Sequence, residues 1–98
     1  MTPYEEIVGA IVEKFVFILG KESATKEVLR VKGLTVTRSG TVKFSGQNQK
    51  AQLEALINRY RIAFGPAAIV FCRDVSGDVV TKHPDLDIPD IIRPTVKV

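Results

Sequence analysis

Residues 34–44 have the sequence LTVTRSGTVKF, and this stretch decides the fold class. Apolar and polar residues alternate on both sides of Arg38-Ser39-Gly40, which is typical of a β-hairpin. If these three residues form the loop, all the apolar side chains lie on one face, whereas a two-residue Ser-Gly loop divides them between both faces. Gly40 then takes the third loop position, which needs a left-handed backbone. The sequence therefore predicts that Leu34 pairs with Phe44, Val36 with Val42 and Thr37 with Thr41.

A long amphipathic helix is expected before the hairpin. Its start is marked by Thr2 as the N-cap, Pro3 at the first helical position and Glu5 as the partner in a capping box. Apolar residues then recur at three- and four-residue spacing as far as Leu19, and Gly20 provides a natural end. One face of this helix should therefore lie in a core.

The apolar surface of this first helix is wider than one packing partner needs. Ala10, Val16 and Phe17 lie outside the main apolar stripe. A second helix of the same chain would cover them, and so would a second copy of the chain. We therefore treat Val16 and Phe17 as candidate dimer contacts.

Further helices flank the hairpin on both sides. A short helix is predicted over residues 23–31, although residues 27–37 also fit an extended strand. Asn48 is a suitable N-cap for a long helix that ends at Gly65. Residues 67–73 are apolar all round, so they fit a buried helix or a buried strand, and we favour the helix. The fold class is then α+β and mostly helical, in the order helix, helix, β-hairpin, helix, helix.

Two of the predicted helices align at a constant offset of 45 residues. Phe15 matches Tyr60, and Gly20 at the end of the first helix matches Gly65. The alignment suggests that a helix pair is duplicated on either side of the hairpin, which predicts internal pseudo-symmetry. Such matches also arise by chance between any two amphipathic helices, so both explanations stay open.

The composition changes after Gly77, and three prolines follow among residues 81–94. Prolines at this spacing are incompatible with a regular helix. We therefore expect one compact domain over residues 1–77 and an extended tail over residues 78–98. The tail is too apolar for a solvated linker, so it should pack on the domain or on a partner. Its apolar residues include Leu86, Ile88 and Ile91.

Composition excludes several classes of protein. Of the 98 residues, 45% are hydrophobic and 26% are charged, which is typical of a folded domain rather than a disordered chain. The densest apolar stretch, residues 7–19, is shorter than the ~20 residues that cross a bilayer, so we expect no membrane contact. The single Cys72 cannot form an internal disulfide, and no signal-peptide pattern is seen. We therefore expect a cytoplasmic protein.

The sequence contains no pattern of catalytic or metal-ligating residues. His83 is followed by Asp85, Asp87 and Asp90, but the spacing is not that of zinc ligands and lacks the glycine and final glutamate of a calcium loop. Cys72 lies in an apolar run, where a thiol usually acts as a small hydrophobic group. We therefore expect no enzyme activity, no metal and no cofactor.

Basic residues gather around the second helix and the hairpin. A two-stranded ribbon with threonine and lysine on its exposed face can contact DNA phosphates or enter a groove. The net charge of +3 is small for a nucleic-acid-binding protein, however, and Glu22 and Glu27 dilute the basic patch. The candidate nucleic-acid contacts are Arg30, Lys32, Arg38 and Lys43.

Interaction surface is thus the main functional feature of the sequence. The wide apolar helix and the apolar tail predict a small regulatory or adaptor module that forms a homodimer and binds another protein. Nucleic-acid binding through the basic hairpin is the alternative. Small-molecule sensing between the helices is a third hypothesis, which no cluster of polar residues supports. The predicted dimer and partner contacts are Val16, Phe17, Leu86, Ile88 and Ile91.

Overall fold

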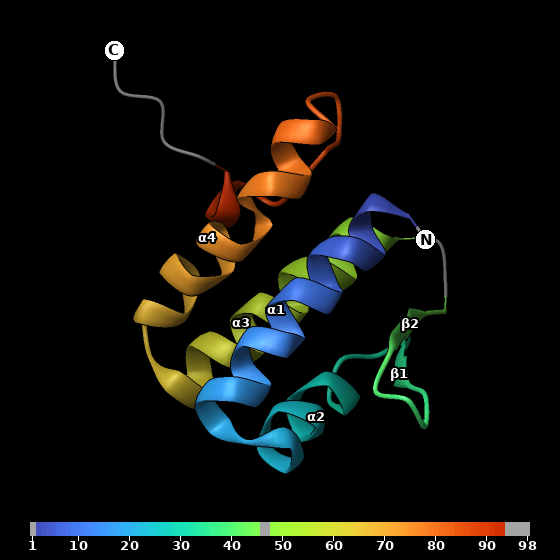
Figure 1. Cartoon of the computed structure of the whole chain (residues 1–98), viewed down its shortest axis with the longest axis vertical. Coiled ribbons are helices and arrows are strands. Elements are labelled where there is room, and N and C mark those ends of the chain that lie inside the picture. The colour runs from blue at the N-terminus through green and yellow to red at the C-terminus, as the bar shows by residue number, and fades with distance from the viewer. Residues whose placement is uncertain (1, 46–47, 94–98) are drawn as a thin grey trace.

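A computed structural model of the chain describes residues 2–45 and 48–93 (Figure 1). Within these residues the chain is mostly helical, with one small antiparallel sheet of two strands, as the α+β prediction requires. The elements in chain order are α1 (Pro3–Leu19), α2 (Lys21–Leu29), β1 (Leu34–Val36), β2 (Val42–Phe44), α3 (Gln49–Phe64), α4 (Ala67–Lys82) and the short 3-10 helix η1 (Asp90–Ile92).

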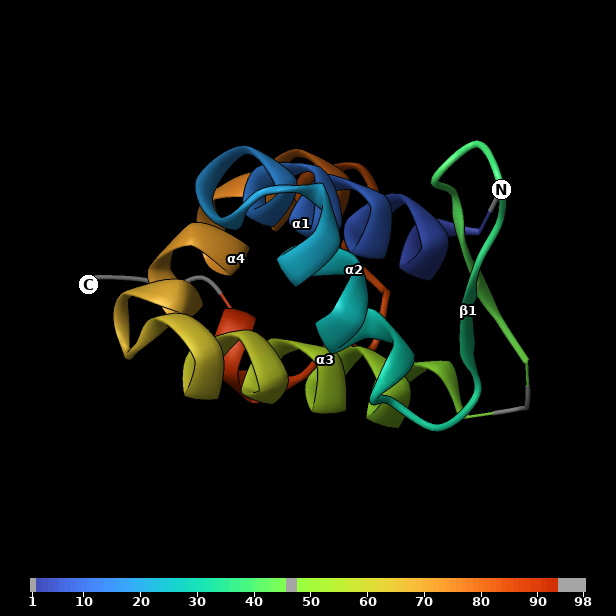
Figure 2. The same ribbon diagram turned by 90° about the horizontal axis from the view of Figure 1, so that it is seen from below.

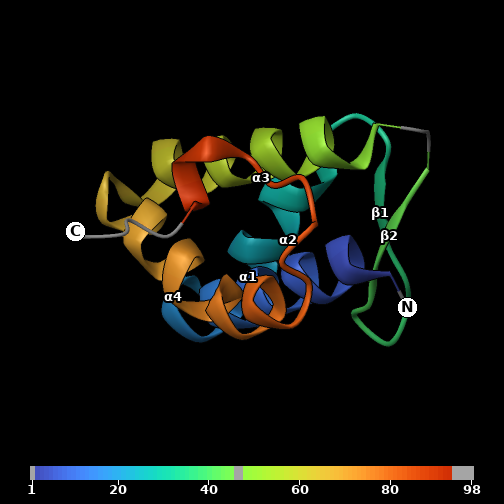
Figure 3. The ribbon, with the colours of Figure 1, turned by 90° about the horizontal axis from the view of Figure 1, so that it is seen from above.

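The helices form two layers with the hairpin at one end. Figures 2 and 3 show α1 and α4 side by side in one layer and α3 in the other, with α2 between the layers. The hairpin stands across the end of the molecule where α1 begins. After α4 the chain turns back, runs between α4 and α3 and enters η1 (Figure 3). Apolar side chains from all of these elements meet in one core.

The hairpin has the predicted register. Leu34 pairs with Phe44 and Val36 pairs with Val42, and Gly40 has a φ of +88° in the loop. Leu34 and Val42 are buried, whereas the strand residues between the apolar ones are exposed. A shift of the pairing by one residue would turn the buried side chains to solvent, which is why the apolar pattern determines the register.

The predicted starts of α1 and α3 are confirmed by their caps. The N–H of Glu5 donates to Thr2 Oγ1 at 3.1 Å, and the N–H of Thr2 donates to Glu5 Oε1 at 2.9 Å, which completes the capping box. Asn48 Oδ1 accepts a backbone N–H of the first turn of α3 at 3.1 Å. Gly20 ends α1 with a φ of +92°, and α2 begins directly after it at Lys21 rather than at residue 23.

Residues predicted as either helix or strand are helical. Residues 27–29 belong to α2 and residues 67–82 form α4, so the extended alternatives for these stretches are wrong. The expected domain boundary at Gly77 also needs correction, because α4 continues through it to Lys82. The valines that follow Gly77 pack against the core, and this contact offsets the ~1 kcal/mol cost of a helical glycine. The helix ends just before Pro84, which disfavours helical backbone in the preceding residue.

The segment after α4 packs on its own domain. The side chains of Ile88 and Ile92 are 2% and 0% exposed and belong to the same core as the four helices. Residues 83–89 have no regular structure, in agreement with their prolines, and η1 follows. The remaining part of the predicted tail, residues 94–98, lies outside the described residues.

Polar contacts fix the same segment to three helices. The Tyr4 hydroxyl of α1 donates to the carbonyl of Asp87, and Lys50 Nζ of α3 lies 2.9 Å from the Asp87 carboxylate. Arg73 Nη2 of α4 donates to the carbonyl of Ile91 at 3.2 Å. This segment therefore closes the opening between the two helical layers.

Candidate interaction surfaces

Phe17 is the most exposed large apolar side chain of the described residues, at 86%. It projects from α1 at a shallow groove of about 460 Å³ between α1 and α4. We call this surface the α1–α4 face. It is lined by Ala10, Glu13, Lys14 and Phe17 of α1 and by Asp74, Val75 and Asp78 of α4.

Aromatic rings beside the α1–α4 face reach the surface at one end. Lys14 Nζ lies 5.3 Å from the ring centroid of Phe71, and the Phe71 ring packs against Phe64 with the centroids 5.6 Å apart. Phe64 is 38% exposed, and Val70 of the same region of α4 is 51% exposed. The α1–α4 face therefore continues into apolar surface at the end of α3 and the start of α4.

Charged side chains of both signs surround Phe17. Glu13, Asp74 and Asp78 contribute carboxylates, and Lys14 contributes an ammonium group. Among the described residues, none of these carboxylates forms an ion pair. An apolar centre with a polar rim is the usual anatomy of a protein interface. A face that carries both signs is also able to match a second copy of itself.

The other predicted partner contacts do not share this face. Val16 lines a different groove, between α1 and β2. Ile88 lies in the core of its own chain, and Leu86 and Ile91 are partly buried against that core. Ile88 therefore packs inside its own chain and is not accessible to a partner. Phe17 is the member of the predicted set that is fully presented to solvent.

The four predicted nucleic-acid contacts are all exposed, but they do not form one patch. Arg30 and Lys32 line a groove of about 290 Å³ between the end of α2 and α3. Lys43 lines the groove between α1 and β2, and Arg38 lies in the hairpin loop. Arg30 Nε is also 4.0 Å from a carboxylate oxygen of Glu27, which reduces the positive potential there.

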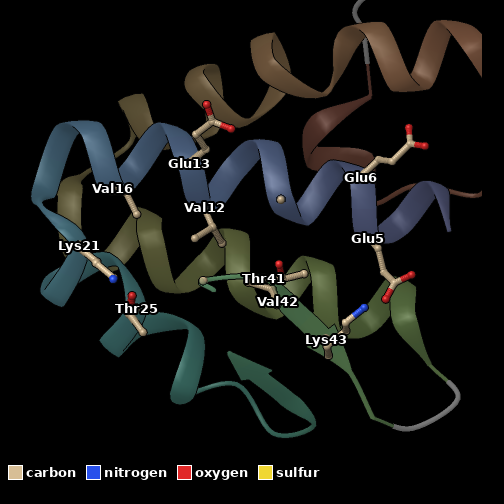
Figure 4. A pocket seen from close by; sticks show the side chains of 12 residues that line it. Glu5, Glu6, Val12, Glu13, Val16, Lys21, Thr25, Thr41, Val42 and Lys43 are labelled. Carbon is tan, nitrogen blue, oxygen red and sulfur yellow. The ribbon is translucent and has the colours of Figure 1, made fainter. Parts of the chain in front are cut away.

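A second groove, of about 380 Å³, runs between α1 and β2 (Figure 4). We call it the α1–β2 groove. Figure 4 shows Val12 and Val42 at its middle, with glutamates of α1 on one side and Lys43 on the other. The sequence alone does not reveal this groove, because its walls come from distant segments and meet only when the hairpin packs beside α1. It is lined by Glu5, Glu6, Gly9, Val12, Glu13, Val16, Lys21, Thr25, Gly40, Thr41, Val42 and Lys43.

The glutamates of the α1–β2 groove differ in their surroundings. The hydrogen bond from the Thr2 backbone N–H is the main cause that holds the pKa of Glu5 below its ordinary value, and the nearby Lys43 acts in the same direction. Glu5 therefore already has a hydrogen-bond donor and a nearby cation within its own chain. Glu6 and Glu13 form no ion pair among the described residues, so their charges are open to a partner.

Two buried polar groups of α4, the Cys72 thiol and the Ser76 hydroxyl, belong to the packed interior. Burial raises the pKa of the Cys72 thiol to about 12, so the nucleophilic thiolate is scarcely populated at neutral pH. The hydroxyl of Ser76 donates to the Cys72 carbonyl at 2.6 Å within α4. In residues 2–45 and 48–93 no three His, Cys, Asp or Glu side chains are grouped so that they could hold a metal ion.

No family model matches the sequence, and comparisons with curated proteins and with solved structures likewise give no match. In the described part of the chain, no helix combines the length and the apolar character that crossing a membrane requires. The two surfaces of α1 are therefore the main features of the molecule that bear on function.

Proposed function

We propose that the chain is a non-catalytic protein-interaction module that forms a homodimer through the α1–α4 face. The observation that carries this proposal is the 86% exposure of Phe17. Burying a phenylalanine side chain contributes roughly 1.5–3 kcal/mol, so a partner that covers this ring gains that free energy. Aromatic side chains at the centre of an interface are common energetic anchors.

A second copy is the partner that the face fits best. In a twofold arrangement, Lys14 of one chain lies against the carboxylates of the other, and the two Phe17 rings meet near the axis. The small size of the domain favours the same conclusion, because a chain of this length buries a modest share of its surface on folding. Burial of further apolar surface on dimerisation would add stability.

An adaptor or regulatory role requires a second surface that stays free in the dimer. The α1–β2 groove is the candidate, because it shares only Glu13 with the α1–α4 face and its other lining residues lie elsewhere on α1 and on α2, the hairpin loop and β2. The further contacts for another protein are Val16 of this groove and two partly buried residues of the C-terminal segment, as we call residues 83–93 after α4. These two residues are Leu86 and Ile91. The buried, unpaired Cys72 suits a reducing compartment, so we place the module in the cytoplasm.

The sharpest test of the dimer face uses the absence of tryptophan from the chain. A Phe17→Trp variant carries a single indole at the proposed interface. We expect its emission maximum to lie at short wavelength at high protein concentration and to shift to long wavelength on dilution. Leu29→Trp on α2, at a residue that is 59% exposed, is the matched control and should stay at long wavelength throughout. Identical long-wavelength emission from both variants at all concentrations would rule out the proposed face.

Nucleic-acid binding is the second candidate function. The exposed outer surface of the hairpin, with Thr35, Arg38 and Lys43, supports it. The proximity of Glu5 to Lys43 argues against it, because the carboxylate competes with phosphate. If this candidate holds, DNA affinity falls steeply with salt and is lost in an R38E/K43E variant. Absence of any salt-dependent binding by the unmodified chain removes the candidate.

The duplication of a helix pair stays a prediction, and the backbone at the matched glycines supports it. Gly20 has φ and ψ of +92° and 155°, and Gly65 has +115° and 178°. Both glycines end a long helix, and the next helix begins directly after Gly20 and one residue later, after Pro66, in the case of Gly65. Two helix pairs with such similar connections are what a duplicated unit would retain.

A further inference from the structure

We infer that the groove of about 290 Å³ between the end of α2 and α3 binds an acidic amphipathic helix of another protein. We call it the α2–α3 groove. The inference rests on the proposed protein-interaction function and names the chemistry of a partner. The α2–α3 groove shares no lining residue with the α1–α4 face or with the α1–β2 groove, so this proposal and the homodimer can fail separately.

The α2–α3 groove is lined by cations and by no carboxylate. Arg30 and Lys32 follow the end of α2 on one wall, and Arg59 belongs to α3 on the other. Glu54 lies in the same part of α3 but does not line the groove. The α1–α4 face and the α1–β2 groove, in contrast, are each lined by carboxylates as well as by ammonium groups. Charge complementarity therefore favours an anionic partner at the α2–α3 groove.

One carboxylate outside the lining holds the two arginines close together. Glu27 Oε1 lies 3.0 Å from Arg59 Nη2 and 4.0 Å from Arg30 Nε. The Glu27 side chain is 13% exposed, whereas the arginine side chains are more accessible. A guanidinium group has five N–H donors, so both arginines keep donors for a ligand. Together with Lys32, the three cations outnumber this single carboxylate, and the cluster stays positive.

Small apolar side chains line the α3 wall between the cations. Ala51 and Ala55 are exposed and lie one turn apart on α3, and Arg59 lies one turn farther along. This row spans ~12 Å of the helix. Val31 adds apolar surface on the facing wall. Helix axes approach more closely where the side chains at the contact are small, so a second helix fits along this row.

The two walls of the α2–α3 groove are fixed to each other. Gln52 Nε2 of α3 donates to the carbonyl of Lys32 at 3.2 Å and to the carbonyl of Ser45 at 3.0 Å. Figure 2 shows the end of α2 beside α3. A groove whose walls are already in place loses less conformational entropy when a partner binds.

An acidic helix fits the α2–α3 groove better than nucleic acid does. None of the described residues that line it is aromatic, so bases have no ring on which to stack. The other two predicted nucleic-acid contacts, Arg38 and Lys43, lie outside this groove. A sugar-phosphate backbone would match the cations alone. A helix with carboxylates beside aliphatic side chains matches the cations and the alanines together.

The test measures binding of a fluorescein-labelled peptide with four repeats of Glu-Leu-Ala-Ala to the full chain by fluorescence anisotropy. In a helix, this repeat places the carboxylates in one row and the leucines in the next row. We expect saturable binding, and we expect Lys-Leu-Ala-Ala repeats to bind at least about tenfold more weakly, a difference of ~1.4 kcal/mol. Failure of the acidic peptide to bind, or equal binding of the two peptides, would overturn the inference.

Two further probes separate an acidic helix from other anions. Proline in place of the central alanines breaks the helix of the acidic peptide and should abolish its binding. Labelled single-stranded and duplex DNA should bind more weakly than the acidic peptide. Equal binding of the proline peptide would show that the groove does not select a helix, and tighter binding of DNA would assign the cations to phosphate. Either result would overturn the inference.

Charge reversal locates the acidic peptide on the chain. Lys32→Glu should weaken its binding at least about tenfold. Arg61→Glu makes the same change of net charge at an exposed residue of α3 that does not line the groove, and should change the affinity far less. Neither Lys32 nor Arg61 forms an ion pair among the described residues, so both variants should fold normally. Equal affinities of the two variants would overturn the inference.

A second pair of variants tests the alanine row. Ala55→Leu fills the groove and should weaken binding at least about tenfold. Ala63→Leu adds the same side chain at an exposed alanine of α3 outside the groove and should leave binding unchanged. Equal affinities of these variants would place the peptide elsewhere and overturn the inference. Phe17→Ser should bind the acidic peptide normally, whatever its effect on the dimer, and loss of binding in this variant would assign the peptide to the α1–α4 face instead.

Discussion

The ring of Phe15 in α1 stacks on the ring of Tyr60 in α3, with the centroids 4.1 Å apart and an angle of 8° between the planes. Both side chains are fully buried, and they join the two helical layers at the centre of the core. The same two residues match each other in the 45-residue alignment of the sequence. Contact between matched residues is what a twofold pseudo-symmetry axis through the core would produce.

Replacing Tyr60 by phenylalanine should destabilise the chain by about 1 kcal/mol, the usual net value of one hydrogen bond. The Tyr60 hydroxyl donates to the Ala24 carbonyl at 2.9 Å in a buried setting, so the variant loses this bond while the ring stack remains. Urea unfolding followed by circular dichroism measures the change. Tyr4→Phe removes an exposed hydroxyl and should change the stability less. Equal effects of the two substitutions would contradict the structural role of the Tyr60 hydroxyl.

Gly33→Ala should cost clearly more stability than Gly40→Ala. Both glycines have positive φ, +91° and +88°, so each alanine carries a left-handed penalty of roughly 1–2 kcal/mol. At Gly33 the new Cβ would also lie 2.6 Å from the Ser45 carbonyl oxygen and would collide with the Gln52 amide, whereas at Gly40 it would meet nothing within 4 Å. Urea midpoints of the two variants give the comparison, and equal midpoints would show that the turn around Gly33 is looser than described.

Ile88→Ala should destabilise the chain by about 2–5 kcal/mol, as for other buried isoleucines. Ile88 is 2% exposed, so its removal leaves a cavity in the core. Val70→Ala, at a residue that is 51% exposed, is the control and should change stability little. If instead Ile88→Ala leaves the unfolding midpoint unchanged, the C-terminal segment does not dock on the domain in solution.

Glu5→Gln should reduce the sensitivity of the chain to acid. The pKa of Glu5 is lowered in the folded state from 4.5, so the unfolded chain takes up the proton first as the pH falls. The stability that the ionised side chain contributes is therefore present above pH 4.5 and is lost as the pH falls through the folded pKa. Glutamine keeps the capping geometry without titrating. The difference in urea midpoint between wild type and variant should shrink from pH 7 to pH 3, and a constant difference would contradict the sign.

Local patterns were sufficient to predict the helix caps and the hairpin register. The capping box of Thr2 and Glu5 and the alternation around Gly40 involve neighbours in sequence, whose geometry depends on backbone sterics and short-range hydrogen bonds. The end of α4 was harder to predict. Gly77 is a helix breaker by propensity, but tertiary packing of the following residues outweighs that preference.

The candidate surfaces could be predicted only in part. The width of the apolar surface on α1 pointed to Phe17, because a residue outside the main stripe cannot share the same core. Ile88 is also apolar, like Phe17, but it is buried in the core. Its burial depends on the path that the chain takes between α4 and α3, which the sequence pattern does not reveal. The α1–β2 groove depends on how the hairpin docks, which no local pattern encodes.

The homodimer is tested most directly by the solution mass of the full chain, measured by light scattering over a range of protein concentrations. Dimerisation through the α1–α4 face predicts twice the mass of one chain for the wild type and for the Leu29→Ser control, and the mass of a single chain for Phe17→Ser. A wild type that stays monomeric at all concentrations would contradict it, and so would a dimer that Phe17→Ser leaves intact.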